Sequence, residues 1–304
     1  MDCHGIYDSS DEEFVFKMLL NEEEEHVLKT IRQPRSCFIK RTRSNYFWNN
    51  VYPELDVVTY KHYYRKSKES MNKLTDMVNV ELEDYADNWD KLHKIVCMTV
   101  EYLAHKTTIL LMSAKYCFSD GLVHRHLQVV LKVLAHSIHD QLVTWPSENE
   151  RHAISNRFIR QRGLPMCTGV IDGTLVKSFG YYHRRDEMNT RKCFYGFNVV
   201  LICDDTGLVR QGWYDQVGSE ADSTILREST WYQNINAHLS NSNNPLRSFY
   251  ILSDKEIQGY IGVVTPFVEQ SNAEALNAKQ LFFNKIVQQS RALIERVIGL
   301  HKSR

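Results

Sequence analysis

Three acidic residues stand where a folded chain could bring their carboxylates together. Asp172 follows the apolar run 167–171, and Asp254 follows the apolar run 248–252. Glu295 lies among apolar residues of a helical pattern near the C-terminus. Acidic side chains bordered by apolar ones are costly to bury unless a cation compensates them. At one edge of a sheet they would form an oxygen-ligand site for Mg²⁺ or Mn²⁺, although three unrelated surface acids remain the alternative.

Asp172 and Gly173 form an Asp-Gly pair, which by itself is typical of a turn. Val170 and Ile171 favour a buried strand, and Gly173 weakens that strand. We therefore expect the strand to end at Gly173, with Asp172 at the rim of a sheet. The residues that follow favour the site over the turn.

The segment from about 60 to 138 has apolar residues at helical spacing, as in Leu92, Ile95 and Val96. Ser119 is the expected N-cap of a second helix after a short turn. Two such helices form either a helix-turn-helix or an ordinary helical bundle. In a helix-turn-helix, the residues expected to face DNA are Lys115, His124, Arg125 and His126.

The pattern changes near Trp145-Pro146. A short basic helix over 151–160 precedes the strand that contains Asp172. Strands are expected over 194–203 and 208–217, joined by a hairpin turn at 204–207. A helix opening at Asp222, strands at 248–252 and 262–267, and a helix from about 273 complete the order, which predicts a mixed α/β layer.

Composition limits the class of protein. The net charge is zero, hydrophobic residues make up 43%, and seven scattered cysteines indicate free thiols. We expect no membrane segment and no signal peptide, because no apolar run approaches the ~18 residues that a span needs. The expected domains are an acidic disordered tail over 1–28, a helical domain over 29–145 and an α/β domain over 146–304.

Residues from about 145 onward resemble the DDE nuclease of PIF/Harbinger transposases and their domesticated relatives. The pieces that carry the resemblance appear in the family's order, and each is weak alone. They are Trp145-Pro146, Gly163-Leu164-Pro165, the run Gly169 to Thr174 around Asp172, Lys192, Asn198, Gly218-Ser219 with Asp222-Ser223, Thr265-Pro266-Phe267, Phe283-Asn284, and Arg291, Glu295 and Lys302 at the family's spacing.

The resemblance implies a ribonuclease-H-like fold behind a mainly helical, helix-turn-helix-like domain, and a divalent-metal-dependent DNA endonuclease. Carried over, Asp172 is the first catalytic carboxylate and Glu295 the third. Asp254 is expected as the second, with Asp222 as close support, and the choice between these two stays open. The implied cofactor is Mg²⁺ or Mn²⁺ at a two-ion site, which holds the attacking and leaving oxygens of a phosphodiester in line.

Basic residues are expected to bind the phosphates of DNA. Arg291 and Lys302 lie about one turn before and two turns after Glu295, and plain helix-surface charge is their alternative role. A basic connection after the Asp172 strand adds Arg184, Arg185 and Lys192. The expected partners are double-stranded DNA and a Myb-like DNA-binding protein, the expected location is the nucleus or also the cytoplasm, and a homodimer is left open.

The chain departs from the family pattern near the second acid. Lys255 and Glu256 follow Asp254 directly, and Ala221 stands where relatives have histidine. The chain also stops earlier than its relatives, so a C-terminally truncated copy is expected. These departures keep open a catalytically inactive, domesticated DNA- or protein-binding factor with the same fold. A metal-dependent phosphohydrolase is disfavoured because no phosphate-cradling glycine loop is visible.

Overall fold

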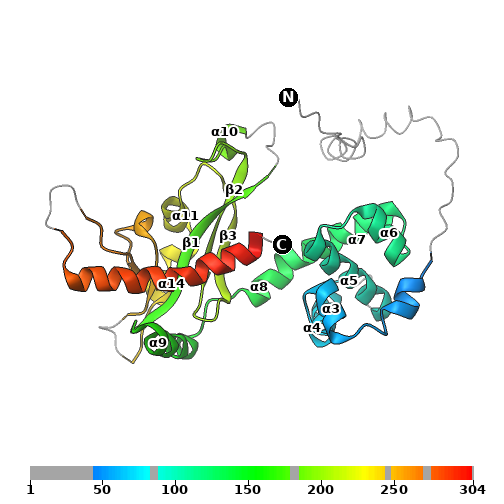
Figure 1. Ribbon diagram of the computed structural model, residues 1–304, viewed down its shortest axis with the longest axis horizontal. Coiled ribbons are helices and arrows are strands. Elements are labelled where there is room, and N and C mark those ends of the chain that lie inside the picture. Colours follow the sequence, from blue (N-terminus) through cyan, green and yellow to red (C-terminus); the bar gives the residue numbers. More distant parts are fainter. Residues whose placement is uncertain (1–43, 83–87, 179–184, 244–247, 270–274, 303–304) are drawn as a thin grey trace. The chain divides into compact units, whose positions relative to one another are not determined.

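The computed structural model describes residues 44–82, 88–178, 185–243, 248–269 and 275–302 (Figure 1). It contains a helical region and a mixed α/β region, each with its own hydrophobic core. The expected tail over 1–28 lies outside the described residues. None of the described helices is both long and apolar enough to cross a bilayer.

The helical region consists of short helices whose starts are capped by polar side chains. Asp56, Ser67 and Ser119 each accept a hydrogen bond from a backbone N–H in the first turn, which satisfies donors that the helix leaves unpaired. The expected N-cap at Ser119 is confirmed. The elements are η1 (Phe47–Val51), α3 (Val57–Tyr64), α4 (Lys68–Glu81), α5 (Trp89–His105), α6 (Ile109–Tyr116), α7 (Asp120–Val133), η3 (Leu134–Ile138) and α8 (His139–Leu142).

Two of the four residues expected to face DNA from this region do not. Lys115 turns inward, where its Nζ donates to the buried Glu101 carboxylate at 2.7 and 2.8 Å and lies over the Tyr63 ring. His126 is buried against Phe118. The prediction was wrong for both, because the partner of Lys115 lies on a preceding helix that the local pattern does not reveal. His124 and Arg125 are exposed on α7.

The α/β region contains a five-stranded sheet in the order β3-β2-β1-β4-β5. β2 runs antiparallel to β1 and β3, whereas β4 runs parallel to β1 and β5. The predicted mixed sheet is therefore confirmed. Its elements are α9 (Glu148–Arg162), β1 (Cys167–Lys177), α10 (Arg185–Met188), β2 (Gly196–Cys203), β3 (Val209–Val217), α11 (Asp222–Glu228), α12 (Thr230–Gln233), α13 (Ile235–His238), β4 (Tyr250–Leu252), η5 (Lys255–Ile257), β5 (Val263–Val264) and α14 (Ala278–Lys302).

β1 does not end at Gly173, as expected, but continues to Lys177. The continuation is stabilised by pairing with β2, in which Asp172 lies opposite Leu201 and Gly173 opposite Val200. On its other side, the last β1 residue paired with β4 is Val170. Asp172 is therefore inside a strand, at the point where one of its two neighbours stops.

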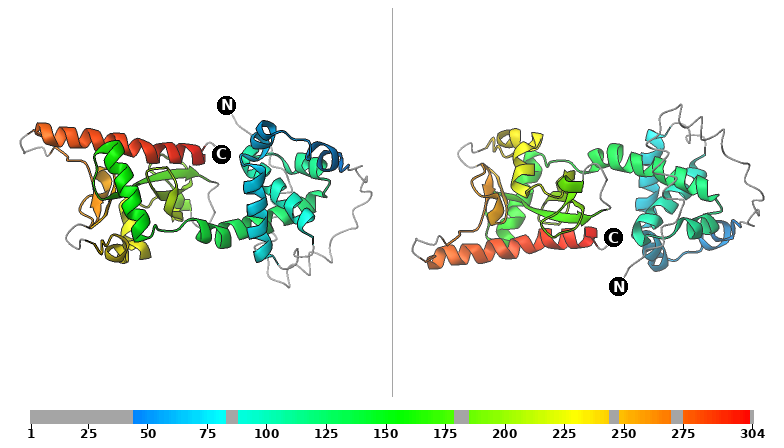
Figure 2. Two further views of the ribbon diagram at one scale, coloured as in Figure 1. Left: turned by 90° about the horizontal axis from the view of Figure 1, so that it is seen from below. Right: turned by 90° about the horizontal axis from the view of Figure 1, so that it is seen from above.

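Helices cover both faces of the sheet (Figure 2). Alternate residues of β1 point to opposite faces, as in any strand. Val170 packs in the cluster formed with α9 and α14, and Ile171 packs in the cluster formed with α11 to α13. The side chain of residue 172 therefore faces α14, and residue 173 faces α11.

The β2–β3 turn is held by two buried carboxylates, and the expected hairpin turn at 204–207 is confirmed. Asp204 accepts from the backbone N–H groups of Thr206 and Leu208 and from Arg210 Nε. Asp205 accepts from Arg157 of α9 at 2.6 and 2.8 Å. This two-bond pair ties the hairpin to α9 and so fixes the end of the sheet that carries residues 201–203.

A buried histidine organises the core of the helical region. Thr75 Oγ1 donates its hydrogen to the Met71 carbonyl at 3.0 Å, so it must accept from His93 Nδ1 at 2.8 Å. His93 Nε2 then accepts from the Tyr52 hydroxyl at 2.6 Å. Burial lowers the pKa of His93 to about 4, which keeps the ring neutral in the folded chain.

Acidification should therefore destabilise this region through His93. The unfolded ring takes up a proton near pH 6.5, whereas the folded ring does so only near pH 4, so stability is lost as the pH falls between these values. Between pH 7.5 and 5 we expect His93 to contribute a loss of about 2 kcal/mol in unfolding free energy, measured by urea unfolding. His93→Gln should flatten this dependence. The exposed control His124→Gln should keep it, and an unchanged slope in His93→Gln would contradict the assignment.

Candidate active site

Asp172 and Asp254 follow the same pair of residues on two neighbouring parallel segments. Val170 pairs with Leu252 as the last pair of the β1–β4 ladder, each acid comes two residues later, and the charge of Asp254 acts on Asp172. Asp254 directly follows the buried Ser253 and caps η5, where its Oδ1 accepts from the Glu256 N–H at 2.9 Å. The fold thus brings together two carboxylates that are 82 residues apart in the sequence.

The environment of Asp172 opposes its ionisation. Burial is the main cause that raises the pKa of this carboxyl to about 6, and the charges of Asp254 and Asp222 contribute to the rise. Arg291 acts in the opposite direction, with Nη2 at 3.3 Å from Asp172 Oδ2. Like charges this close repel strongly where water is scarce. The site therefore favours a cation beside Asp172.

Asp222 reaches the same strand from the opposite face of the sheet. It begins α11, and its carboxylate lies directly over Gly173, where a Cβ atom would overlap it. Asn198 of β2 donates to Asp222 Oδ1 at 2.6 Å and to the Glu220 carbonyl at 2.9 Å. Burial is the main cause that raises the pKa of Asp222. Asp222 thus lies across β1 from the face that Asp172 shares with α14.

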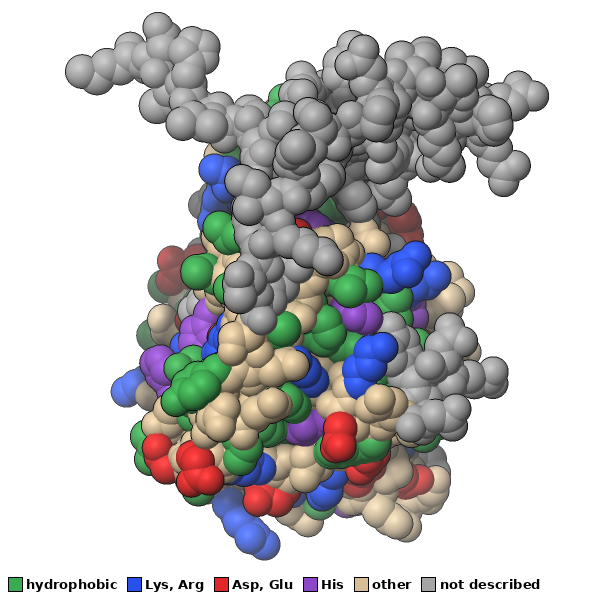
Figure 3. Space-filling model, turned by 90° about the vertical axis from the view of Figure 1, so that its right-hand side faces the viewer, with side chains coloured by type: hydrophobic (Ala, Val, Ile, Leu, Met, Phe, Trp, Pro, Cys, Tyr) green, Lys and Arg blue, Asp and Glu red, His purple; other side chains and the backbone are tan. Residues whose placement is uncertain are grey.

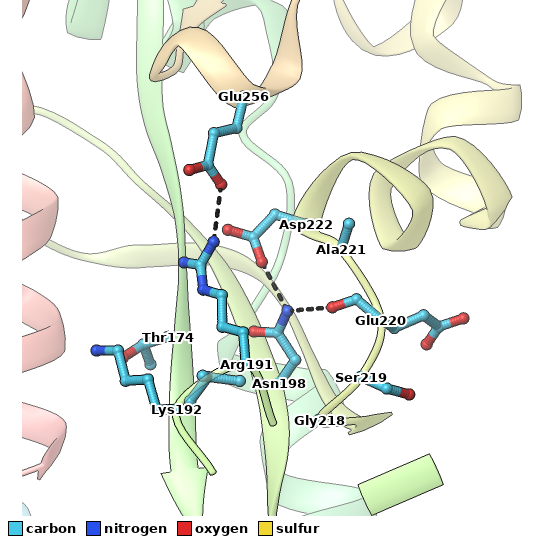
Figure 4. Close-up of a pocket in the computed structure, with 12 residues that line it drawn as sticks. Thr174, Arg191, Lys192, Asn198, Gly218, Ser219, Glu220, Ala221, Asp222 and Glu256 are labelled. Carbon is cyan, nitrogen blue, oxygen red and sulfur yellow. Dashed lines mark hydrogen bonds and ion pairs between the residues drawn. The ribbon is translucent and has the colours of Figure 1, made fainter. Parts of the chain in front are cut away.

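A pocket of about 180 Å³ opens on this α11 side of β1 (Figure 4). Asn198 lies at its floor, only 4% exposed, and points its amide nitrogen at Asp222 and Glu220. At the rim, Arg191 reaches toward Glu256 and pairs with it at 3.3 Å. The pocket is lined by Gly173, Thr174, Leu175, Arg191, Lys192, Asn198, Gly218, Ser219, Glu220, Ala221, Asp222 and Glu256.

Helix α14 presents Arg291, but not Glu295, to Asp172. Glu295 is exposed and makes no hydrogen bond or ion pair with any described residue. It lies four residues beyond Arg291, and Lys302 lies eleven beyond, so at 3.6 residues per turn the three share one edge of the helix. That edge adjoins the buried stripe that includes Ile294. Glu295 is therefore about one turn away from the residue that contacts Asp172.

The other residues expected to bind phosphate lie in different parts of the region. Lys192 is exposed at the rim of the pocket, and Lys302 is exposed at the end of α14. Arg184 lies outside the described residues. Arg185 begins α10, but its side chain is not described.

Three polar atoms on or beside the central strands are buried without a hydrogen-bond partner: Asn198 Oδ1 on the α11 face, Ser253 Oγ directly after β4, and Arg291 Nε on α14. Buried polar groups are normally paired, so each of these atoms is available to a partner from outside the chain. Among the described side chains, no group of three or more His, Cys, Asp or Glu residues is close enough to hold a metal ion.

Asn198, Arg191 and Glu256 were not among the residues expected at the site. Asn198 belonged to the motif pieces quoted above, which was the available signal, but its role depends on the β2 pleat that turns it toward Asp222. Arg191 and Glu256 come from separate segments, 65 residues apart. Their pairing could not be predicted from local sequence.

Comparison with known families gives one result. Residues 171–304 match the DDE superfamily endonuclease family. The match covers less than half of the chain and includes all four of the acids considered above. It suggests a transposase-like nuclease that acts on DNA. No match was found among curated proteins or among solved structures.

Gly173→Ala should disturb the site because the added methyl group would occupy the position of the Asp222 carboxylate. We expect a loss of about 1–3 kcal/mol in unfolding free energy, as for other overpacked positions, measured by urea unfolding. Gly299→Ala is the matched control. No atom lies within 4 Å of its added Cβ, and a helical glycine changed to alanine gains about 0.5–1 kcal/mol. Equal stabilities of the two variants would contradict the packing described here.

Proposed function

We propose that the α/β region is a divalent-metal-dependent DNA endonuclease of the DDE type, derived from a Harbinger-type transposase, with a ribonuclease-H-like fold. The proposal is carried by one observation: Asp172 and Asp254 each follow the last β1–β4 ladder pair by two residues, and the charge of Asp254 raises the pKa of Asp172. The single antiparallel strand in a five-stranded mixed sheet, the family match over 171–304 and the motif order support it.

The donor set fits a hard divalent cation. Mg²⁺ usually binds through one or two protein carboxylates, and water and substrate phosphates complete its shell. Asp172 and Asp254 are such a pair. The pKa of Asp172 is raised mainly by burial and also by the neighbouring carboxylates, and a bound cation would favour the ionised form against both. When bound, divalent ions activate water and stabilise the attacking and leaving oxygens of a phosphodiester.

The remaining residues take supporting roles in this proposal. Glu295 completes the ligand set from the edge of α14, and Asp222, held by Asn198, supports β1 from the other face. Arg291, Lys302 and Lys192 neutralise phosphates of the bound strand, as do Arg184 and Arg185. Each role combines the family resemblance with the positions described above.

Asp172→Asn should abolish metal-dependent nicking of supercoiled DNA while preserving the fold, because the amide removes one charge and little volume. We expect the initial rate with Mg²⁺ or Mn²⁺ to fall at least about a hundredfold, and likewise for Asp254→Asn. Nicking is measured by agarose gel with a chelator as the blank.

Glu228→Gln is the matched control, since Glu228 is exposed on α11 and its carboxylate pairs only with the exposed Arg227. Its rate should equal that of the wild type. If wild type and Asp172→Asn are equally inert with both ions, the enzyme is excluded and the second candidate stands.

The second candidate is a catalytically inactive, domesticated DNA- or protein-binding factor. It is favoured by the contact of Arg291 with Asp172 and by the exposed position of Glu295, which together leave the ligand set incomplete. The presence of Lys255 and Glu256 beside Asp254 also favours the inactive factor. The nicking experiment separates the two candidates.

We also propose that α6 and α7 form a helix-turn-helix that contacts double-stranded DNA. Cys117 takes a left-handed backbone conformation in the turn between them, and α7 exposes His124 and Arg125. On the face in Figure 3 the Lys and Arg side chains are scattered among other types and form no continuous basic surface. A Myb-like partner would then supply additional DNA affinity and nuclear import, and a homodimer would double the contacts.

DNA binding by the chain alone should be weak and strongly salt-dependent. We expect a micromolar Kd near physiological salt, as for binding that depends on a few phosphate contacts. Arg125→Ala should weaken binding and reduce the slope of log K against log salt by about one, measured by fluorescence anisotropy. Lys61→Ala, at an exposed position of α3, is the control and should change neither. Tight, salt-insensitive binding, or an inert Arg125→Ala, would contradict this model.

A further inference from the structure

The contact between Arg291 and Asp172 is poorly formed. It consists of one hydrogen bond, from Arg291 Nη2 to Asp172 Oδ2, at 3.3 Å. Arg291 Nε is buried and has no partner. Arginine normally binds a carboxylate through two shorter, parallel hydrogen bonds. The guanidinium thus compensates the charge of Asp172 while leaving one of its own buried donors unsatisfied.

The chain also contains an arginine–carboxylate pair with two short, parallel hydrogen bonds. Arg157 donates through Nε at 2.6 Å and Nη2 at 2.8 Å to the two oxygens of Asp205. That pair joins α9 to the β2–β3 turn and has a purely architectural position. Arg291 has the same donors available but makes one bond of 3.3 Å, a length found otherwise in the exposed pair of Arg191 with Glu256.

The charges around Asp172 are also unbalanced. The charge of Asp254 acts on Asp172, and Asp222 adds a third carboxylate from the opposite face of the sheet, where the charge of Arg191 acts on it. Among the described side chains, only Arg291 forms an ion pair with Asp172, at 3.3 Å. A divalent cation on the Asp172 oxygens would compensate this charge better, and it would repel a guanidinium left in place.

Arg291 has an alternative partner on its own helix. It lies on the same edge of α14 as Glu295, one turn away, and Glu295 has no partner among the described residues. Residues four apart on a helix can pair. A released guanidinium could therefore turn along the helix edge toward Glu295 or toward a phosphate of bound DNA, without any movement of the backbone.

We infer that Arg291 is a displaceable counter-ion, which holds Asp172 in the metal-free chain and leaves it when a divalent cation binds. This inference rests on the proposed metal-dependent function and adds a specific competition between an arginine and a metal. Metal entry and release of a phosphate-binding arginine then become one event. Arg291 is thus a positioning residue, because it holds the Asp172 carboxylate until a cation binds.

The test measures Mn²⁺ binding without DNA, by the electron paramagnetic resonance signal of free Mn²⁺. Arg291→Gln should bind Mn²⁺ at least about fivefold more tightly than the wild type, because the competing charge is gone. Arg296→Gln removes the same charge from an exposed position of the same helix and should bind as the wild type does. The gain should disappear in the double variant Asp172→Asn/Arg291→Gln.

The outcomes separate this inference from the function on which it rests. Asp172-dependent Mn²⁺ binding that is unchanged or weaker in Arg291→Gln overturns the counter-ion and leaves the metal site. Absence of Asp172-dependent binding in every variant overturns both.

A second measurement uses the wild type and does not depend on the folding of Arg291→Gln. The buried Arg291 Nε–H, assigned by its loss in Arg291→Lys, should exchange faster with water once Mg²⁺ saturates the site, as followed by ¹H–¹⁵N NMR. Exchange that is indifferent to saturating Mg²⁺ overturns the inference.

Discussion

The parallel register between β1 and β4 is the constraint on which the candidate site depends. Three ladder pairs, with a bulge between Cys167 and Gly169, align the two strands up to Val170 and Leu252, and Asp172 and Asp254 each follow that last pair by two residues. β4 has only three residues, so its position depends on burial of Ile251 and Leu252 in the two opposite clusters. The position of Asp254 relative to Asp172 thus depends on two apolar side chains, Ile251 and Leu252, which pack on opposite faces of the sheet.

The pleat of β1 distributes the acids over two faces, and this distinguishes their roles. Asp172 faces α14 and meets Arg291, whereas the backbone of Gly173 faces α11 and accommodates the Asp222 carboxylate. The charge of Asp222 contributes to the raised pKa of Asp172 across this strand. This arrangement favours Asp254 over Asp222 as the partner of Asp172. Asp254 follows the strand next to β1, whereas Asp222 lies on the other face of the sheet.

Local patterns predicted the elements well and their long-range contacts poorly. Apolar spacing indicated the helices of the first region, and the Asp204–Gly207 turn between two apolar runs indicated the hairpin. The expected end of a strand at Gly173 was wrong because β2, which begins at Gly196, continues to pair with β1 as far as Lys177. The inward turn of Lys115 toward Glu101 depends on a preceding helix in the same way. The four acids of the candidate site were recognised through motif order, and only the fold reveals which of them share a face.

Two of the arginine–aspartate pairs among the described residues, Arg157–Asp205 and Arg291–Asp172, differ in geometry. Arg157 and Asp205 satisfy each other with two short bonds, so nothing is gained by separating them. Arg291 and Asp172 leave a buried donor unpaired and a raised pKa uncorrected, which costs stability in the isolated chain. In the proposed function, this cost is offset when a cation binds at Asp172 and a phosphate binds at Arg291. The imperfect pair is then the metal-free form of the proposed site.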